Sequence, residues 1–394
     1  MDRHPTIRLA KGRDRSLRRR HPWIYSGAIG AVDGEPASGD VVRVADHRDS
    51  FLAWAYFNKA SKLQARVLDW NEAASIDAEW WRSRVRESLD RRKGIPGLDG
   101  TDVYRAVYAE ADCLPGLIVD RYGPSLAVQT LSYGMDRRLP IILDVLEDLL
   151  HPGGIVERNE SPLRTLEALP QRSGILRGAA PPLEIVEHGI RYLVDPLRGQ
   201  KTGFFLDQRE NRAAVRVVAR GARVLDCFCN DGGFALNAAA AGATDVLGLD
   251  ASPEAVGTAA DNVRRNGCTN VRFEQADVFD RLRSLKEEGA AWDVIVLDPP
   301  SFTRSRKTVP VARKGYRQLH ALAFALLAPD GFLLTASCSH HITAEAFRDD
   351  IVRSAERAGR SLQLLDWRGA APDHPTLPAV PETAYLKFGV FRVI

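Results

Sequence analysis

Val224-Leu-Asp-Cys-Phe-Cys-Asn-Asp-Gly-Gly-Phe234 is an apolar run that ends in an acidic turn with two glycines. The pattern predicts a buried strand, a tight turn and then a helix. The same rhythm continues along the chain, and we expect strands at 223–227, 245–249, 271–275, 292–297 and 331–336, with helices at 209–220, 233–241 and 253–266. Strands that alternate with helices form a parallel sheet that is covered by helices on both faces. The sequence therefore predicts an α/β fold with a doubly wound sheet.

Acidic residues close three successive strands of this sheet, namely Asp226, Asp250 and Asp277. Ligands of such sheets bind beyond the carboxyl ends of the strands, and the acid that ends the second strand is placed to bind a ribose diol. Gly232 and Gly233 would let the backbone approach a ligand closely. Glycine turns also follow strands where no ligand binds, so the acids carry more of the prediction than the glycines do.

The acids also indicate which nucleotide cofactor fits. The dinucleotide fingerprint G-x-G-x-x-G is absent from the turn. A pyrophosphate would be repelled by Asp226 and Asp231, whereas a sulfonium and an ammonium group would be attracted. The pattern favours S-adenosylmethionine, a nucleoside with a cationic tail.

The fourth strand leads into Asp298-Pro-Pro-Ser-Phe302. Two prolines fix the backbone, so this turn would present the Asp298 carboxylate and backbone carbonyls beside the cofactor. Six basic residues and no acid occur between 301 and 317: Arg304, Arg306, Lys307, Arg313, Lys314 and Arg317. Such a run is usually a solvated face, but beside a predicted active site we favour phosphate binding.

Cys338 follows the strand at 331–336 and is the cysteine predicted to lie opposite Asp298. Methylation of carbon 5 of a pyrimidine requires a nucleophile at carbon 6, and a thiolate can supply it. We expect Cys227 and Cys229 to pack beside the cofactor turn. Of the remaining cysteines, Cys268 follows a predicted helix and Cys113 lies outside the predicted α/β domain. A lone cysteine is usually inert, so residue type alone leaves the role open.

Composition bounds the remaining possibilities. The chain has 394 residues, of which 45% are hydrophobic and 27% charged, as in an ordinary folded protein of two or three domains. No apolar run is long enough to cross a bilayer and no signal peptide is recognisable, so we expect a cytoplasmic protein without a membrane partner. The five scattered cysteines predict free thiols and no metal site. His340 and His341 lack a third ligand, and no role is assigned to them.

The N-terminal half differs in pattern from the α/β region. Short strands with glycine turns over 40–44, 51–57 and 64–68 predict a small barrel or sandwich, and residues 1–25 hold eight Lys or Arg against two Asp. A helix is expected at 76–93. Strands at 116–120, 126–131 and 190–194 around a helix at 139–150 indicate a middle α+β domain.

Several blocks of the chain together resemble a known family. They are 21–27, 111–123, Gln200-Lys-Thr-Gly-Phe-Phe-Leu-Asp-Gln-Arg209, the cofactor turn, 298–302 and 337–339. The block that ends at Arg209 is the most specific of them. Over essentially its whole length the chain resembles the class I S-adenosylmethionine-dependent ribosomal RNA cytosine-5 methyltransferases of large-subunit type that carry an N-terminal PUA domain. The resemblance implies an RNA-binding PUA barrel at 1–72, a middle α+β domain at 73–195 and a Rossmann-like methyltransferase domain at 196–394.

The resemblance also implies roles for individual residues. Cys338 would be the nucleophile; the position of Asp298 at the end of the fourth strand adds it as a second catalytic residue, which would hold the edge of the target base. The substrate would be a cytosine of 23S ribosomal RNA, free or partly assembled, and the protein would form a homodimer. The predicted cofactor-binding residues are Lys201, Thr202, Phe204, Arg209, Asp226, Phe228, Gly232, Gly233, Asp250, Ala251, Asp277, Val278, Asp298 and Pro299. The predicted RNA-binding residues are Arg18, Arg19, Arg20, Trp23, Arg304, Arg306 and Lys307.

One departure from the family pattern leaves the target atom open. Many RNA cytosine-5 methyltransferases have a second cysteine near the Asp-Pro-Pro turn, where this chain has Ser301. A single cysteine also suits uracil-5 chemistry. One alternative is a methyltransferase that relies on Asp298 and acts on guanine N7, against which Cys338 argues, or on an exocyclic amine. Another is a non-catalytic RNA-binding assembly factor.

Overall fold

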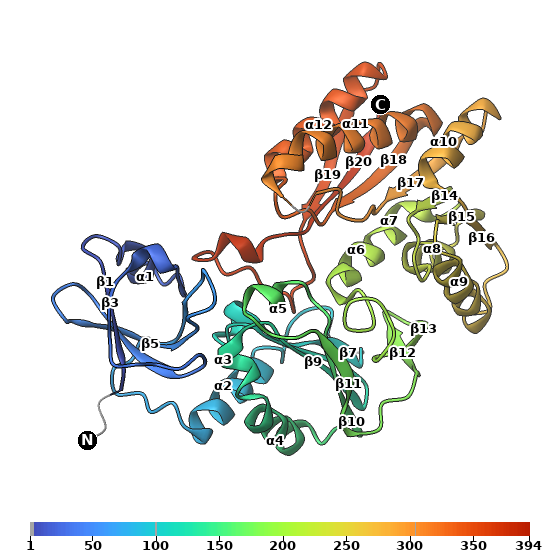
Figure 1. The fold of residues 1–394 in the computed structure, drawn as a ribbon. Coiled ribbons are helices and arrows are strands. Elements are labelled where there is room, and N and C mark those ends of the chain that lie inside the picture. Colours follow the sequence, from blue (N-terminus) through green and yellow to red (C-terminus); the bar gives the residue numbers. More distant parts are fainter. Residues whose placement is uncertain (1–3, 99–100, 304) are drawn as a thin grey trace. The chain divides into compact units, whose positions relative to one another are not determined.

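In a computed structural model that describes residues 4–98, 101–303 and 305–394, the chain forms two compact units. The first comprises Met1–Ile185, Val194–Leu206 and Pro372–Thr383. The second comprises Val186–Leu193, Asp207–Ala371 and Ala384–Ile394. Figure 1 shows the path of the chain through its helices and strands.

The first unit begins with a six-stranded sheet in the order β2-β6-β5-β4-β1-β3. Its strands are β1 (Thr6–Leu9), β2 (Trp23–Ile24), β3 (Ile29–Asp33), β4 (Val41–Ala45), β5 (Phe51–Phe57) and β6 (Ala65–Asp69), and the short helix α1 (Arg15–Arg18) lies between the first two. Alternate apolar side chains of these strands, with Leu17 of the helix, form one core. The strand predicted at 51–57 is confirmed residue for residue.

The middle of the chain adds a five-stranded sheet in the order β11-β10-β9-β8-β7. The strands are β7 (Val103–Tyr108), β8 (Leu117–Tyr122), β9 (Ser125–Thr130), β10 (Gly154–Asn159) and β11 (Arg172–Gly178), and the helices are α2 (Ala78–Asp90), α3 (Tyr133–Asp136), α4 (Leu139–Leu150) and α5 (Leu163–Leu166). The side chains of α2 and α4 pack in the same core as this sheet. The predicted α+β character of the middle segment and the helix at 139–150 are confirmed.

A hairpin of β12 (Leu183–Glu187) and β13 (Ile190–Val194) leads into the second unit. There a seven-stranded sheet has the order β16-β15-β14-β17-β18-β20-β19. Its strands are β14 (Arg223–Cys227), β15 (Asp245–Asp250), β16 (Val271–Gln275), β17 (Trp292–Leu297), β18 (Leu327–Ser337), β19 (Leu362–Arg368) and β20 (Lys387–Val393). The order reverses at β14, as a doubly wound sheet requires.

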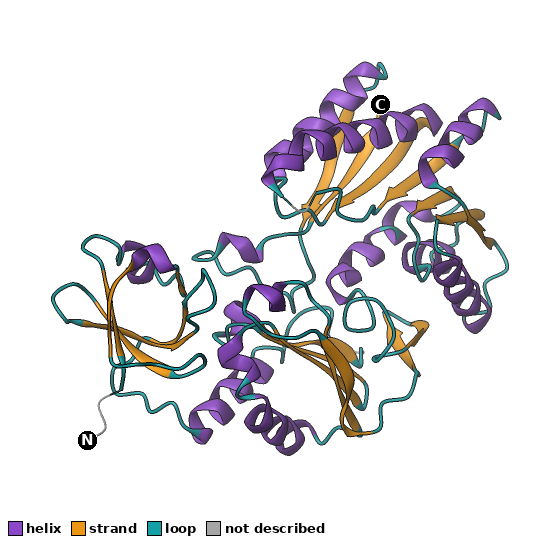
Figure 2. Cartoon of the chain, viewed as in Figure 1, coloured by secondary structure: helices purple, strands orange, loops and turns teal. Residues whose placement is uncertain are grey.

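Helices cover both faces of this sheet (Figure 2). They are α6 (Arg209–Ala214), α7 (Arg216–Ala219), α8 (Gly233–Ala240), α9 (Pro253–Arg265), α10 (Val278–Glu287), α11 (Val309–Leu326) and α12 (Ala344–Arg357). One core joins the sheet to α10, α11 and α12, and a second joins it to α6, α7 and α8. Among the described residues, none of the helices combines the length and apolarity needed to cross a bilayer.

Two predictions about this unit need correction. The sheet is not wholly parallel, because β20 runs antiparallel to both β18 and β19. The connection from β19 to β20 contains no α-helix, and strands joined without a crossover helix can pair antiparallel. The single helix predicted at 209–220 is two short helices, α6 and α7, which meet at Val215.

Candidate active site

The carboxyl ends of four parallel strands bring the predicted site turns to one edge of the sheet. In the register, Cys227 of β14 lies opposite Leu249 of β15 and Leu297 of β17, and Leu297 lies opposite Thr335 of β18. The turns that follow these strands carry the predicted site glycines and acids and the candidate nucleophile. The sheet topology therefore places these turns along one edge of one sheet.

The turn between β14 and α8 has an unusual backbone. Phe228, Asn230 and Gly232 have φ values of 64°, 48° and 81°. Two of these residues are not glycine, and a left-handed conformation costs them conformational energy. Two backbone N–H groups hold the turn to β15: Cys229 N donates to the backbone carbonyl of Leu249 at 3.0 Å, and Asn230 N donates to the side-chain oxygen Asp250 Oδ2 at 3.0 Å. Such strain is typical of ligand-binding loops.

The structure gives a reason within the protein for both glycines of the turn. A Cβ atom at Gly232 would lie 2.8 Å from Phe273 Cζ. A Cβ atom at Gly233 would lie 2.3 Å from Arg212 Cδ. These distances are shorter than real Cβ contacts, so a side chain at either position would require Phe273 or Arg212 to shift. Their role in approach to a ligand stays a prediction.

Asp226 is the centre of a group of carboxylates. Its side chain is fully buried, Oδ2 accepts a hydrogen bond from Ala235 N at 3.0 Å, and Oδ1 has no hydrogen-bond partner among the described residues. Burial, with repulsion from Asp298, Asp231 and Asp250, raises the pKa of Asp226 to about 8. A cationic ligand would relieve this repulsion, so the group fits the sulfonium and ammonium of S-adenosylmethionine.

Asp231 belongs to the same group but has a cation nearby. Burial raises its pKa to about 6, and Arg212 opposes the rise. Arg212 is itself held by Glu187 in a buried bidentate ion pair, with contacts of 2.8 and 2.7 Å. The charge of Arg212 is therefore shared between two acids.

The other two strand-end acids have local roles in the fold. Asp250 accepts hydrogen bonds from Asn230 N at 3.0 Å and Ser252 N at 2.9 Å, and Ala251 beside it is exposed. Asp277 caps α10 by accepting from Asp280 N at 3.0 Å, and the next residue, the predicted cofactor contact Val278, is buried. Their contacts with the cofactor stay predictions.

The Asp298 carboxylate is held by a residue that the sequence reasoning did not single out. Gln208 Nε2 lies 2.9 Å from each carboxylate oxygen. The side-chain oxygen Gln208 Oε1 accepts in turn from Asn211 Nδ2 at 2.6 Å, which fixes the orientation of the Gln208 side-chain amide. Gln208 lies in the Gln200–Arg209 block, and the specificity of that block was the available signal.

Two further predicted cofactor contacts lie next to these residues in the sequence. Pro299 is buried, and Arg209 is fully buried and pairs with Glu210 at 3.2 Å.

Cys338 lies directly after β18 and is half-buried. The serines on either side of it are fully buried and belong to a hydroxyl network. Ser337 Oγ donates to Tyr316 OH at 3.0 Å, and Ser339 Oγ lies 3.2 Å from Tyr316 OH and 3.0 Å from Ser301 Oγ. The last contact connects the turn after β18 to the turn after β17.

The other cysteines are placed less favourably for chemistry. Cys227 and Cys229 are buried, as predicted, and burial raises the pKa of both thiols well above the ordinary value. Cys268 follows the end of α9 and precedes β16, so it lies toward the opposite edge of the sheet. Cys113 belongs to the first unit.

Three predicted cofactor contacts belong to the first unit. Thr202 is buried, and its Oγ1 donates to Asp120 Oδ2 at 2.5 Å. Phe204 is buried as well. Lys201 Nζ lies 4.2 Å from the centre of the Phe205 ring. Their roles toward the cofactor stay predictions.

The predicted RNA-binding residues near the N-terminus differ in whether their side chains make contacts within the protein. Arg18 is paired with Asp14 at 2.5 Å and Asp46 at 3.1 Å. Trp23 donates its indole N–H to Glu110 Oε1 at 2.8 Å. The two remaining residues of this set are exposed: Arg19, and Arg20, whose guanidinium lies over the Trp70 ring.

The basic run after the Asp-Pro-Pro turn is also divided. Arg306 and Lys307 are exposed, whereas Arg304 lies outside the described residues. Arg313 and Arg317 both pair with the buried Asp350 of α12, each at 2.7 Å. These two arginines therefore join α11 to α12, and phosphate binding by the run stays a prediction.

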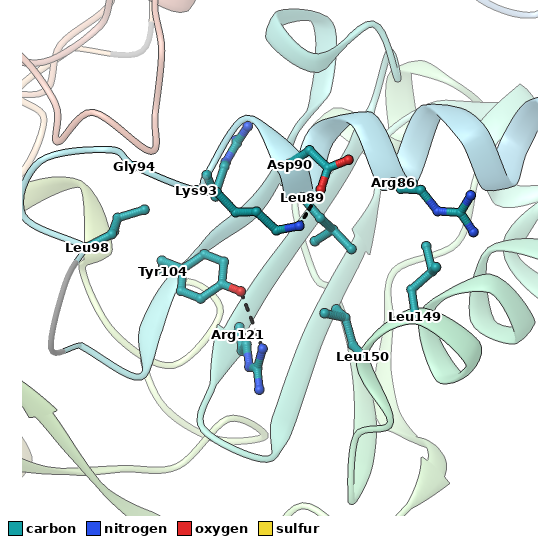
Figure 3. A pocket seen from close by; sticks show the side chains of 11 residues that line it. Arg86, Leu89, Asp90, Lys93, Gly94, Leu98, Tyr104, Arg121, Leu149 and Leu150 are labelled. Atoms are coloured by element: carbon teal, nitrogen blue, oxygen red, sulfur yellow. Dashed lines mark hydrogen bonds and ion pairs between the residues drawn. The ribbon is translucent and has the colours of Figure 1, made fainter.

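The first unit has an open pocket of about 460 Å³ that no prediction had indicated. Figure 3 shows two of its basic side chains in contact with neighbours: Lys93 with Asp90 at 2.6 Å, and Arg121 with the Tyr104 hydroxyl at 3.4 Å. Leu89, Leu98, Leu149 and Leu150 contribute the apolar part of the lining.

Comparison with known proteins identifies two domain families. Residues 7–70 match the PUA-like domain, and residues 176–392 match the S-adenosylmethionine-dependent methyltransferase family. The Ribosomal RNA large subunit methyltransferase I of Klebsiella pneumoniae (strain 342) is 38% identical over 394 residues, which cover 99% of this chain and 98% of the relative. The protein of that name from Cronobacter sakazakii is 38% identical over 383 residues, with coverage of 96% and 97%.

Solved structures show the same fold. A protein from Streptococcus mutans described as a SAM-dependent methyltransferase has a TM-score of 0.82 at 22% identity, covering 98% of this chain and 99% of that one. SMU.776, described as a methyltransferase complexed with SAH, has a TM-score of 0.84 at 22% identity and the same coverage. With a methyltransferase match over more than half of its length and relatives aligned from end to end, the chain belongs to the S-adenosylmethionine-dependent methyltransferase family and carries a PUA-like domain near its N-terminus.

Proposed function

We propose that this methyltransferase forms 5-methylcytosine in large-subunit ribosomal RNA, with Cys338 as the nucleophile. The observation that carries the proposal is the position of Cys338, at the carboxyl edge of the sheet and one strand away from Asp298. The RNA substrate is inferred from the names of the relatives and from the PUA-like domain. The resemblance to cytosine-5 enzymes supplies the target atom.

The chemistry requires a thiolate because carbon 5 of cytosine is a poor nucleophile. The Cys338 sulfur forms a bond to carbon 6, and the electron pair of the carbon 5–carbon 6 double bond becomes available at carbon 5. Bound S-adenosylmethionine supplies the electrophilic methyl group. After carbon 5 is methylated, a base removes its proton, the double bond re-forms and the bond to Cys338 breaks.

Residues around the thiol would hold the base in place. The Asp298 carboxylate is oriented by Gln208 and can accept a hydrogen bond from the exocyclic amine of cytosine. The fully buried carboxylate of Asp226 and the half-buried carboxylate of Asp231 would hold the cationic part of the cofactor. Arg306 and Lys307 are exposed in the single 3-10 turn Arg306–Thr308 that precedes α11, where they can bind RNA phosphates.

Analysis of modified nucleosides in ribosomal RNA tests this proposal. Large-subunit RNA from cells that lack the protein is compared with RNA from cells complemented by the wild type, by Cys338→Ala or by the control Cys268→Ala. We expect 5-methylcytosine to be lost at one site in the deletion and in Cys338→Ala, and restored by the wild type and the control. A methyl group on uracil carbon 5, guanine N7 or an exocyclic amine would refute the base assignment. Persistence of methylation in Cys338→Ala would refute the covalent mechanism.

A further inference from the structure

Lys387 is a buried lysine beside the turn that carries Cys338. It is the first residue of β20 and lies opposite Ser337 in the antiparallel register with β18. Only 6% of its surface is exposed. Its Nζ donates to Ser339 O at 2.7 Å and to Tyr385 O at 2.8 Å. No ion pair with a carboxylate is found for it among the described residues.

A lysine in this position is costly. Lysine is almost never fully buried unless it is paired, because the ammonium group loses its hydration. Burial lowers the pKa of Lys387 to about 8, and the charge of Cys338 is the one influence that opposes this. Two hydrogen bonds to carbonyl groups would also be available to a neutral donor, so they do not by themselves require a cation.

We propose that Lys387 is a positioning residue for Cys338, which fixes the turn at Ser339 and provides the positive charge that favours the thiolate. The inference rests on the proposed function of Cys338 and deepens it. Electrostatic coupling is reciprocal: if the thiolate favours the charged lysine, the charged lysine favours the thiolate by the same free energy. The thiolate is the form that attacks carbon 6, so Lys387 would increase the reactive fraction near neutral pH.

Other groups on neighbouring elements bear on the same thiol. Tyr316 of α11 interacts electrostatically with both Cys338 and Asp298, and burial raises its pKa to about 12, so it stays neutral. The Asp298 carboxylate disfavours a nearby thiolate. His340 has its pKa lowered by burial and by Lys387, and it provides little positive charge at neutral pH. Lys387 is then the cation with the clearest effect on Cys338.

The test measures the reactivity of the Cys338 thiol in the full-length protein without RNA. Alkylation by iodoacetamide is followed between pH 5.5 and 9.5 by mass spectrometry of the peptides that carry Cys338 and Cys268. The variants are Lys387→Met, which removes the charge, Lys387→Gln, which keeps a neutral donor, and Lys387→Arg, which keeps the charge. Affinity for S-adenosylmethionine and protection of the buried Cys227 and Cys229 report on folding.

We expect Cys338 in the wild type to react with a lower apparent pKa than Cys268. In Lys387→Met and Lys387→Gln, its profile should move to higher pH by about one unit, a roughly tenfold loss of rate near pH 7, with cofactor affinity unchanged. Lys387→Arg should restore most of the rate. An unmoved profile in the folded neutral variants would overturn the proposal. If those variants do not fold, a wild-type Cys338 pKa that is no lower than that of Cys268 overturns it.

The same experiment separates this inference from the proposed function. Loss of 5-methylcytosine in Cys338→Ala tests the role of the thiol in catalysis, whereas alkylation tests only its ionisation. A shifted alkylation profile with persistent methylation in Cys338→Ala would leave Lys387 as the charge partner of a non-catalytic cysteine. An unshifted profile with lost methylation would leave Cys338 as the nucleophile without this partner.

Discussion

The affinity of this methyltransferase for S-adenosylmethionine should increase steeply between pH 6 and pH 7.5. The cationic ligand binds the ionised form of Asp226, whose pKa is raised to about 8 in the unbound protein. With that pKa, about 1% of the side chain is ionised at pH 6 and about 24% at pH 7.5. If the bound sulfonium lowers the pKa below 6, affinity rises roughly 20-fold over this interval. Ionisation of Asp231, with a pKa of about 6, adds about twofold.

Calorimetric titration at four pH values between 6.0 and 7.5 measures the effect. The cofactor's α-amino group has a pKa near 7.7, so about 60% of it is still protonated at pH 7.5, and its own titration reduces the expected rise in affinity by less than twofold. Methylthioadenosine, a neutral thioether with the same nucleoside, is the matched probe and should bind with little dependence on pH. Asp226→Asn, which resembles the protonated acid, should bind weakly and flatten the profile. A dissociation constant for S-adenosylmethionine that changes less than threefold, or an equal slope for the neutral probe, would show that the acid group does not recognise charge.

Three further predictions concern other parts of the molecule. Gln208→Leu removes both hydrogen bonds to the Asp298 carboxylate and should lower kcat about thirtyfold, which corresponds to about 2 kcal/mol in activation free energy. Unchanged turnover in a methyl-transfer assay would contradict this. Arg212→Met leaves the buried Glu187 unpaired and should lower the free energy of unfolding, measured in urea, by about 3–5 kcal/mol. Adding Glu187→Leu should recover most of this loss; if the double variant instead loses the sum of the two single losses, the ion pair is not the cause. Replacing Arg306 and Lys307 by alanine should reduce the slope of log RNA affinity against log salt by about 1.4–1.8, and an unchanged slope would exclude phosphate contacts there.

The sequence was most informative where the signal is local. Strands 223–227, 271–275 and 292–297 are found with the predicted bounds because each is a short run of residues with high strand propensity between turn signals. The helix predicted at 253–266 ends one residue earlier, at Arg265. At its start, Ser252 caps the helix by accepting from Ala255 N at 3.1 Å.

Long-range contacts explain what the sequence did not reveal. Gln208 lies in a recognised block, but nothing in that block indicates its partner Asp298, which is 90 residues away. Lys387 lies in no recognised block, and its partner Ser339 is 48 residues away. Likewise, the basic run gave no indication that Arg313 and Arg317 would pair with Asp350 of α12. A charge pattern shows where cations cluster, but only the fold shows which of them are neutralised by a partner.

The acids at the sheet edge illustrate how the same residue type acquires different properties from its surroundings. Asp226 is fully buried and Asp231 is half-buried; the pKa of Asp226 is raised to about 8 and that of Asp231 only to about 6. The difference follows from Arg212, which opposes the rise at Asp231 but is already engaged by Glu187. The named charges around Asp226 are all carboxylates. Because its fold holds those acids together, the charge that Asp226 needs must come from a ligand, and a cationic cofactor is better suited to this than a pyrophosphate.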